Sequence, residues 1–442
     1  MTVTQKVVME AFHTGHAGSD LASIIAYTAL GPLLVCVLRC YRRYRPALSA
    51  FQAHVQEFVC IVIPLLLCLT ATSKYTIQIA LVLLAIVLLI IAFDTRCSDR
   101  ARNFTDKNDA HCVEDAIGIF KGINILVTCL AILAVDFRIF PRQFSKTEIF
   151  GHSLMDVGTG LFVTSSALTS RFVRKSNAQS LIERLKRCYI VFFLGIGRVF
   201  VVKALDYHEH ASEYGLHWNF FLSLAAVWIL ADGVHSAVRL PSKGAFVGIL
   251  LAFAHQCVLL WGNATTFVFD SPRNGFFAAN REGLLSVSGY LSIYLIVEGV
   301  AWVCLEPLKG VRIVRLIAAT CISWLVWAIC SNYVQETSRR LSNAAYGALT
   351  VSVTCLLLCA YYVVCSFHRL RKDTVLLLRA MRKHSLPVFL VSNVLTGAVN
   401  MACHTVDSGP REALSILVGY SAFLCALVFA LFSDSLPNEM AD

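Results

Sequence analysis

Long apolar runs alternate with short polar segments along the whole chain, and this pattern predicts its fold. Each run holds about 20 mostly apolar residues, which is the length an α-helix needs to cross the hydrocarbon core of a bilayer. The runs lie at residues 21–38, 57–73, 75–94, 116–135, 153–170, 187–204, 216–234, 244–262, 284–304, 313–333, 344–366, 386–403 and 413–433. We therefore predict an all-α polytopic membrane protein with about thirteen transmembrane helices, of which the fifth and the twelfth have the weakest signals.

The composition agrees with this fold. Of the 442 residues, 57% are hydrophobic and 15% are charged, and the mean hydropathy is +0.67. Soluble domains carry about 25% charged residues, so an ordinary water-soluble fold is excluded. The chain has neither an internal repeat nor a linker rich in Pro, Gly or Ser. We expect residues 1–442 to form a single transmembrane domain, folded as one bundle.

Lysine and arginine are distributed unequally between the two sets of loops. If the N-terminus is lumenal, 25 of the 38 fall in cytosolic loops and 11 on the lumenal side. An excess of positive charge marks cytosolic loops, so this asymmetry predicts a lumenal N-terminus and a cytosolic C-terminus. It also accounts for the net charge of +10 through basic loops that face anionic lipid, with no need for a nucleic-acid partner.

Several chemical motifs are absent from the chain. Its 17 cysteines form no CxxC pair and no Cys/His cluster at metal-ligand spacing, so we expect small buried hydrophobes and no metal site. There is no GxSxG elbow, P-loop or HExxH motif. Nucleotide hydrolysis and metal-dependent glycosyl or prenyl transfer therefore lose support.

A polar hairpin between the fourth and fifth spans is the strongest candidate for a chemical site. It runs from Ala134 to Gly160 and reads AVDFRIFPRQFSKTEIFGHSLMDVGTG, on the predicted lumenal side. Pro141 should bend it, which would bring Asp136 and Lys146 to one side. There the carboxylate could act as a general base and the lysine could hold a phosphate or an oxyanion. The alternative is interfacial anchoring, in which cations such as Arg142 snorkel and the aspartate caps a helix.

Three ionisable residues lie within predicted spans. Asp156 is an acidic group inside the fifth span, which makes it a functional candidate by default. Lys121 and Arg198 are the basic residues deep in spans, and they could bind an anionic substrate such as a phospholipid or a CoA phosphate. Alternatively, Asp156 forms a structural ion pair with one of them.

Two lumenal loops offer further candidates for substrate binding. His217 and Asn219 lie in the segment EYGLHWNFF, where the histidine could serve as an acid or base and the aromatic residues could equally form an interfacial belt. Asn280 and Arg281 precede the ninth span. They could close a headgroup pocket, or they could form an ordinary loop turn and helix N-cap.

The twelfth span carries a polar stripe. Ser392, Thr396 and Asn400 place polar side chains at positions i, i+4 and i+8, with Asn393 and Gly397 next to them. Such a stripe can form hydrogen bonds between helices or line a cavity. We count Asn393 and Asn400 as candidate substrate contacts.

Four blocks of this sequence resemble the family of GPI-anchor inositol acyltransferases. The hairpin resembles that family's hallmark segment, and YGLHWNFF at Tyr214–Phe221 resembles its second block. The segments Asn280–Tyr294 and NVLTGAVN at Asn393–Asn400 match a third and a fourth block. Because the four blocks follow the family's order, the resemblance extends over essentially the whole chain.

The resemblance implies a multi-pass enzyme of the endoplasmic-reticulum membrane. Such an enzyme moves a fatty acyl group, typically palmitoyl, from acyl-CoA to the inositol 2-hydroxyl of glucosaminyl-phosphatidylinositol. It implies Asp136 and Lys146 as the catalytic pair, with palmitoyl-CoA as donor substrate and no bound cofactor. His217 and Asn219 would orient the inositol. The lack of a nucleophile elbow favours direct transfer over an acyl-enzyme.

Two other classes of function compete with this interpretation. A lipid or anion transporter (a flippase of the same membrane) would also use Lys121, Arg198 and Asp156, but it predicts an internal repeat that the sequence lacks. A non-catalytic subunit of a membrane complex predicts no densely charged hairpin. Consumption of acyl-CoA by the purified protein would separate the three.

Overall fold

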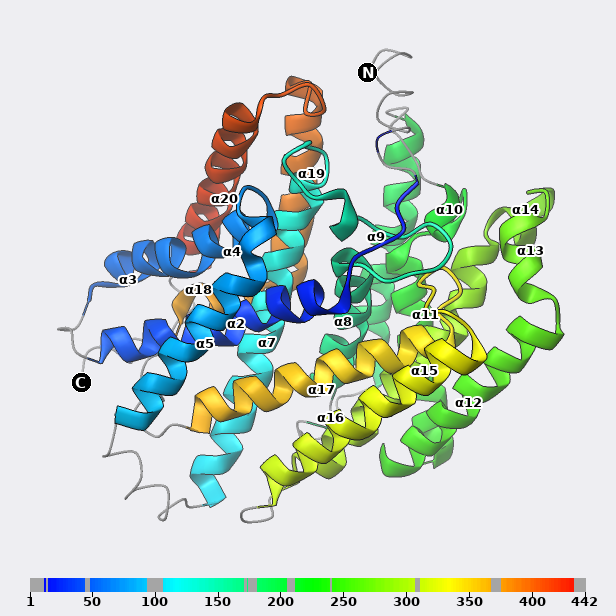
Figure 1. Ribbon diagram of the computed structural model, residues 1–442. Helices are drawn as coiled ribbons and strands as arrows, with labels where there is room; N and C mark the ends of the chain where they lie inside the picture. The colour runs from blue at the N-terminus through cyan, green and yellow to red at the C-terminus, as the bar shows by residue number, and fades with distance from the viewer. Residues whose placement is uncertain are drawn as a thin grey trace. The chain divides into compact units, whose positions relative to one another are not determined.

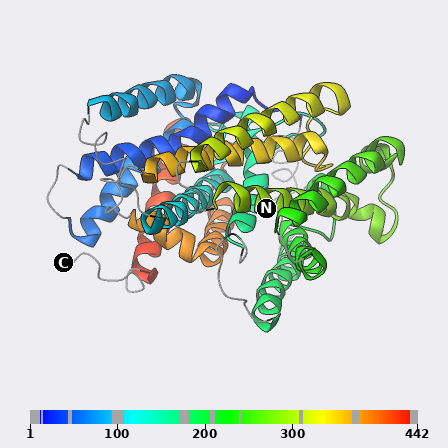
Figure 2. The same ribbon diagram turned by 90° about the horizontal axis from the view of Figure 1, so that it is seen from below.

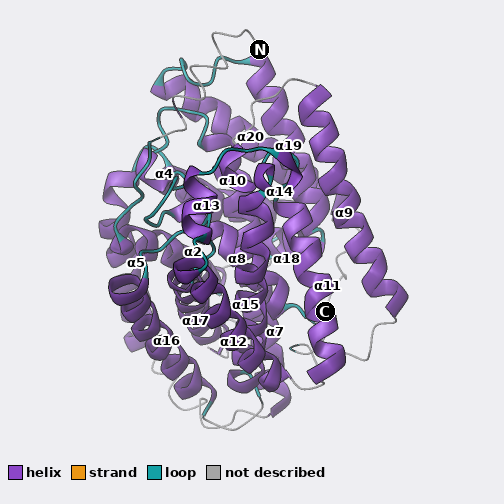
Figure 3. Ribbon diagram, turned by 90° about the vertical axis from the view of Figure 1, so that its right-hand side faces the viewer, coloured by secondary structure: helices purple, strands orange, loops and turns teal. Residues whose placement is uncertain are grey.

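The computed structural model describes residues 12, 15–43, 48–93, 106–170, 173, 181–204, 211–238, 241–306, 311–366 and 375–432. Within these ranges the regular structure is helical and contains no strand, which confirms the all-α prediction (Figures 1 and 3). The chain forms two compact units, each built from two separate stretches. Unit 1 contains Met1–Ser19 and Ser145–Leu356, and unit 2 contains Asp20–Phe144 and Leu357–Asp442.

Unit 1 is organised around one long buried helix, α15 (Arg281–Cys304), which packs against α8, α10, α11, α12 and α16. The helices around it are α8 (Leu154–Leu168), α9 (Leu181–Ala204), α10 (Ala211–Tyr214), α11 (Phe220–Val238), α12 (Pro241–Trp261), α13 (Ala264–Asp270), α14 (Gly275–Ala279), α16 (Arg312–Ile329) and the π-turn η5 (Cys330–Val334). Gly248 lets α12 approach α15 closely, since a Cβ there would lie 3.0 Å from the Ser292 carbonyl oxygen.

Unit 2 is organised around α7 (Asp106–Ala134), which packs against α4, α18, α19 and α20. Its other elements are α2 (Leu21–Arg42), α3 (Ala50–Glu57), η1 (Phe58–Val62), α4 (Ile63–Leu69), η2 (Ser73–Tyr75), α5 (Thr76–Phe93), η4 (Arg142–Phe144), α18 (Leu376–Lys383), α19 (Ser385–Ala402) and α20 (Pro410–Phe432). Helix α2 packs along α5 (Figure 2). Helix α17 (Ala344–Ser366) begins in unit 1 and ends in unit 2.

Eleven helices of the described chain are long and apolar enough to cross a membrane, which confirms a multi-pass membrane protein. Two shorter apolar helices, Leu154–Leu168 and Cys188–Phe200, coincide with the predicted spans at 153–170 and 187–204. The predicted weak span at 386–403 is present as Ser385–Ala402. The total of thirteen spans, the facing of the termini and the single bundle stay predictions.

Candidate functional site

The polar hairpin is divided between the two units, because unit 2 ends its first stretch at Phe144 and unit 1 resumes at Ser145. Asp136 therefore belongs to unit 2 and Lys146 to unit 1. The expectation that the bend brings Asp136 and Lys146 to one side stays a prediction.

Asp136 lies in the turn that follows α7. Its backbone N–H donates to the Leu133 carbonyl oxygen at 3.2 Å, so the turn continues directly from the end of the helix. The side chain is buried, with 8% of the residue exposed. Asn400, near the end of α19, donates a hydrogen bond from Nδ2 to Asp136 Oδ2 at 2.8 Å. A carboxylate thus lies at one end of unit 2, oriented by a neutral amide.

The polar stripe of α19 faces the interior of unit 2. Ser392, Thr396 and Asn400 are buried, as their spacing of four residues predicts, whereas Asn393 is exposed. The Tyr420 hydroxyl of α20 donates to the Cys129 carbonyl oxygen of α7 at 2.9 Å. The stripe therefore lies among hydrogen bonds that join α7, α19 and α20, and it ends at Asn400 beside Asp136.

Arg142 closes the turn around Asp136. Its guanidinium donates to the carbonyl oxygens of Val135 and Phe137 at 2.8 and 3.0 Å, and its Nε to that of Phe140 at 3.2 Å. Burial lowers the pKa of Arg142 to about 10, while the Asp136 charge acts in the opposite direction. Arg142 thus fixes the backbone of the hairpin on both sides of Asp136 and thereby helps to position its carboxylate.

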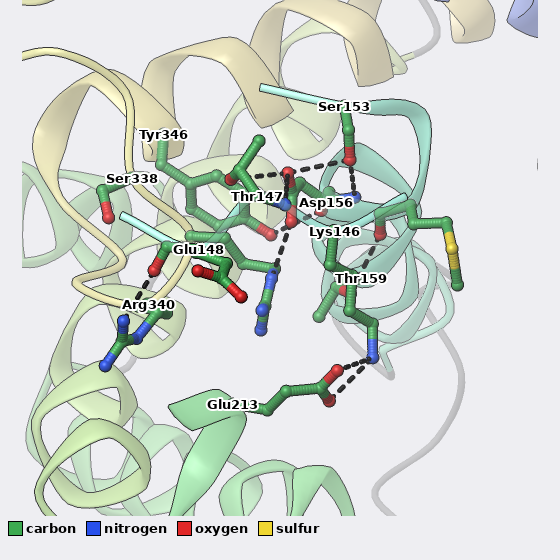
Figure 4. Close-up of polar contacts among 12 residues, drawn as sticks. Lys146, Thr147, Glu148, Ser153, Asp156, Thr159, Glu213, Ser338, Arg340 and Tyr346 are labelled. Atoms are coloured by element: carbon green, nitrogen blue, oxygen red, sulfur yellow. Dashed lines mark hydrogen bonds and ion pairs between the residues drawn. The ribbon is translucent and has the colours of Figure 1, made fainter. Parts of the chain in front are cut away.

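Asp156 is the most heavily hydrogen-bonded side chain of the hairpin (Figure 4). Its Oδ2 accepts from Thr147 N, Thr147 Oγ1 and Ser153 Oγ at 3.1, 2.9 and 2.8 Å. Its Oδ1 accepts from Arg339 Nε at 2.7 Å, and both side chains are almost completely buried. Ser153 also caps α8 by accepting from the Asp156 N–H at 3.1 Å. Asp156 therefore connects the hairpin, the start of α8 and the loop before α17.

The cation beside Asp156 is Arg339, not the Arg198 considered from the sequence. Burial alone would lower the pKa of Arg339, but Asp156 and neighbouring acidic groups raise it well above its usual value. Arg339 and Arg340 lie in the loop between η5 and α17. Sequence reasoning did not single them out, although two adjacent arginines on the side poor in Lys and Arg were a signal that could have found them.

Arg340 connects the same loop to two other segments that are predicted to be lumenal. It donates to the Glu148 carbonyl oxygen at 2.6 Å and to Glu282 Oε1 at 3.0 Å. Arg273 also binds both oxygens of the fully buried Glu282. Loops predicted to share the lumenal face thus contact one another within unit 1.

Lys146 forms an ion pair that the sequence analysis did not predict. Its Nζ donates to Glu213 Oε1 and Oε2 at 2.8 and 2.7 Å, and both side chains are partly exposed (Figure 4). Glu213 belongs to the short helix α10, directly before Tyr214. The Arg339 guanidinium carbon lies 5.9 Å from the centre of the Tyr214 ring, so the two ion pairs are neighbours. Burial raises the pKa of Tyr214, which keeps its phenol neutral.

The other predicted substrate contacts have mainly structural partners in unit 1. The His217 N–H donates to Asn280 Oδ1 at 2.7 Å, and the histidine itself is exposed. Asn219 is buried, donates to the Gly195 carbonyl oxygen at 2.8 Å and accepts from N–H groups at the start of α11. Arg281 is buried and donates to backbone carbonyl oxygens of residues 268, 271 and 272.

The two intramembrane cations lie apart from these clusters in the sequence. Lys121 is half-buried in α7, and Arg198 is exposed on α9. Arg198 is not the hydrogen-bonding partner of Asp156 in the described part of unit 1. Their proposed contact with an anionic substrate stays a prediction.

Comparison with known proteins gives one consistent result. A model of the family described as GWT1 matches residues 5–431. GPI-anchored wall transfer protein 1 of Gibberella zeae is 30% identical, over 97% of this chain and 98% of its own length. The Aspergillus fumigatus protein of the same name is 30% identical, over 96% and 97%. Phosphatidylinositol-glycan biosynthesis class W protein of Dictyostelium discoideum is 28% identical, over 71% and 72%.

Proposed function

Because the chain belongs to the GWT1 family, the inositol acyltransferases of GPI-anchor biosynthesis, we propose that its acyl donor is acyl-CoA and its acceptor is glucosaminyl-phosphatidylinositol. The group moved is palmitoyl, the acceptor atom is the inositol 2-hydroxyl oxygen, and the membrane is that of the endoplasmic reticulum. The observation that carries the proposal is a family match over residues 5–431, which includes the hairpin with Asp136 and Lys146.

In this proposal Asp136 is the general base. It accepts the proton of the 2-hydroxyl while the hydroxyl oxygen attacks the thioester carbonyl carbon. A C–O bond forms, the tetrahedral oxyanion collapses, the C–S bond breaks and the CoA thiolate leaves, to be protonated by Asp136. The hydrogen bond from Asn400 supports this role because it fixes the direction of the carboxylate.

Lys146 stabilises the negative charge in the same proposal. A lysine ammonium carries three N–H donors, and Glu213 receives two of them. The third is available for the oxyanion or for a phosphate of either substrate. Glu213 thereby directs the ammonium without consuming its whole capacity to donate hydrogen bonds.

The test uses microsomes that contain the full chain, labelled palmitoyl-CoA and glucosaminyl-phosphatidylinositol. Asp136→Asn and Lys146→Ala should each reduce acyl transfer, and we expect about a 100- to 10,000-fold loss for the missing base. Asp407→Asn and Arg138→Ala are matched controls, since both side chains are largely exposed and form only a 3.7 Å contact with each other. Normal transfer by both hairpin variants, at normal protein levels, would overturn the assignment of the site.

The lipid or anion transporter has little support from the described residues. Arg198 is exposed, and Asp156 is occupied by Arg339 and three further donors. The two groups are therefore not arranged as a paired charge relay in unit 1.

A further inference from the structure

Four residues with carboxylates, Glu148, Asp156, Glu213 and Glu282, form hydrogen bonds with Lys146, Arg339 or Arg340 in unit 1, and three of these carboxylates have cationic partners. Asp156 accepts from Arg339, Glu213 accepts twice from Lys146, and Glu282 accepts from Arg273 and Arg340. A partly dehydrated carboxylate is costly without such a partner. The fourth carboxylate is that of Glu148.

The Glu148 carboxylate has no hydrogen-bonding or ionic partner among the residues that the structure describes. Its backbone, by contrast, is held, because Arg340 donates to its carbonyl oxygen at 2.6 Å. The side chain is half-buried and points toward the middle of the group formed by Arg340, Lys146 and Glu213 (Figure 4). Glu148 is thus a positioned negative charge without a protein cation.

The same cluster also holds unused donors. Arg339 Nη1 and Arg340 Nε are buried and make no hydrogen bond to any part of the described chain. Their side chains are only 2% and 10% exposed. Buried donors without acceptors are rare in folded proteins and indicate a missing partner, either water or a ligand. The cluster could therefore bind one cation at the Glu148 carboxylate and one anion at the unused donors of Arg339 and Arg340.

We propose that this cluster binds the charged headgroup of the acceptor, with Glu148 on the glucosamine ammonium and Arg339 and Arg340 on the phosphodiester. The inference rests on the proposed function, which supplies an acceptor with one primary ammonium and one phosphodiester. A carboxylate forms a charge-assisted hydrogen bond with an ammonium, and guanidinium groups suit phosphate oxygens. Glu148 is therefore a specificity-determining residue that distinguishes the free amine from an N-acylated amine.

The first experiment measures acyl transfer by the full chain in microsomes, with glucosaminyl-phosphatidylinositol and its chemically N-acetylated form as acceptors. N-acetylation removes the positive charge, so the unmodified protein should use that acceptor with a KM about 10- to 100-fold higher. This comparison needs no variant. Equal KM values for the two acceptors would overturn the role of Glu148.

The second experiment repeats the comparison with Glu148→Gln, which keeps the shape of the side chain and removes its charge. The KM for the free amine should rise about 10- to 100-fold, with kcat and the KM for the N-acetylated acceptor nearly unchanged. Glu336→Gln is the matched control, because Glu336 is an exposed carboxylate on the Arg339–Arg340 loop. An equal loss with both acceptors, or no loss with either, would contradict the proposal.

The phosphodiester end is tested on the unmodified protein by competition. Water-soluble glucosaminyl-inositol that carries a phosphate should inhibit transfer more strongly than the same compound without the phosphate. Equal inhibition by the two compounds would contradict phosphodiester binding by Arg339 and Arg340, and their unused donors would then bind water. Failure of the proposed function is distinguishable in the same assay, because the unmodified protein would then transfer no label to glucosaminyl-phosphatidylinositol at all. Both proposals would be wrong in that case.

Discussion

Two aspartates of the same hairpin, Asp136 in unit 2 and Asp156 in unit 1, are held in contrasting ways. Asp156 accepts from a guanidinium, two hydroxyls and a backbone N–H. Asp136 accepts from the neutral amide of Asn400. Asp156 is paired with a buried guanidinium, whereas the hydrogen bond from Asn400 to Asp136 comes from a group that carries no charge. From this difference we expect a structural role for Asp156, and it supports the proposed role of Asp136 in proton transfer.

The contrast between Asp156 and Asp136 illustrates two roles that a buried carboxylate can have. A carboxylate with a buried guanidinium partner can fix loops in register, because removing either partner leaves an uncompensated charge. A carboxylate held by an amide can be aimed at a substrate hydroxyl. Loss of Asp156 should therefore reduce the amount of folded protein, and loss of Asp136 should reduce rate alone.

The largest effect on stability should follow Asp156→Asn. The change leaves Arg339 buried without its anion, so we expect the free energy of unfolding to fall by about 3–5 kcal/mol. Thermal unfolding of the purified protein in detergent measures it, with Asp407→Asn as an exposed control. The double variant Asp156→Asn/Arg339→Met should lose less than the sum of the single changes. Full additivity would mean that the ion pair carries no coupling.

A smaller effect, on rate, should follow Asn400→Ala. Without the Nδ2 donor the Asp136 carboxylate loses a hydrogen bond that orients it. We expect kcat to fall about 10- to 160-fold, since a hydrogen bond to a charged group is worth about 1.5–3 kcal/mol. Asn393→Ala on the exposed side of the same helix is the control. An equal fall in kcat for the Asn393 variant would show that the helix is sensitive to substitution in general. It would contradict a specific role of Asn400 in positioning Asp136.

The smallest effect on stability should follow Glu213→Gln. Because the Lys146–Glu213 pair is partly exposed, we expect a loss of about 0.2–1 kcal/mol, which decreases further at high salt. Activity should respond more than stability, since the Lys146 ammonium loses the group that directs it. A stability loss as large as that of Asp156→Asn would mean that the two ion pairs of unit 1 contribute equally to folding.

Local sequence patterns predicted the helices well. The span predicted at 344–366 is the helix Ala344–Ser366, and the weak run at 153–170 contains Leu154–Leu168, which begins at the Ser153 cap. These features depend on apolar runs and capping residues within a few positions of one another, so a single segment contains the necessary information. The buried face of α19 followed for the same reason from the spacing of Ser392, Thr396 and Asn400.

The partners of the site residues could not be predicted in this way. Arg339 lies 183 positions from Asp156, and Glu213 lies 67 positions from Lys146. Such pairs depend on how distant helices pack, which hydrophobic periodicity does not specify. The π-turn η1 was missed as well, because its sequence FVCIV is an unbroken part of an apolar run. The resemblance to a family predicted a catalytic role for Asp136 and Lys146, but it did not predict the residues that bind their side chains.

Because each unit is built from two separate stretches of the chain, parts of one unit are synthesised at very different times. Asp136 is synthesised 264 residues before Asn400, the side chain that orients it. At about 5–20 residues per second, translation leaves that interval open for about 13–53 s. For most of this time α7 is without α18 and α19, and α20 is synthesised only afterwards, although all three pack against α7 in unit 2. The catalytic candidate is therefore completed among the last steps of synthesis, so a nascent chain stalled before Asn400 would contain the whole hairpin and still lack its oriented carboxylate.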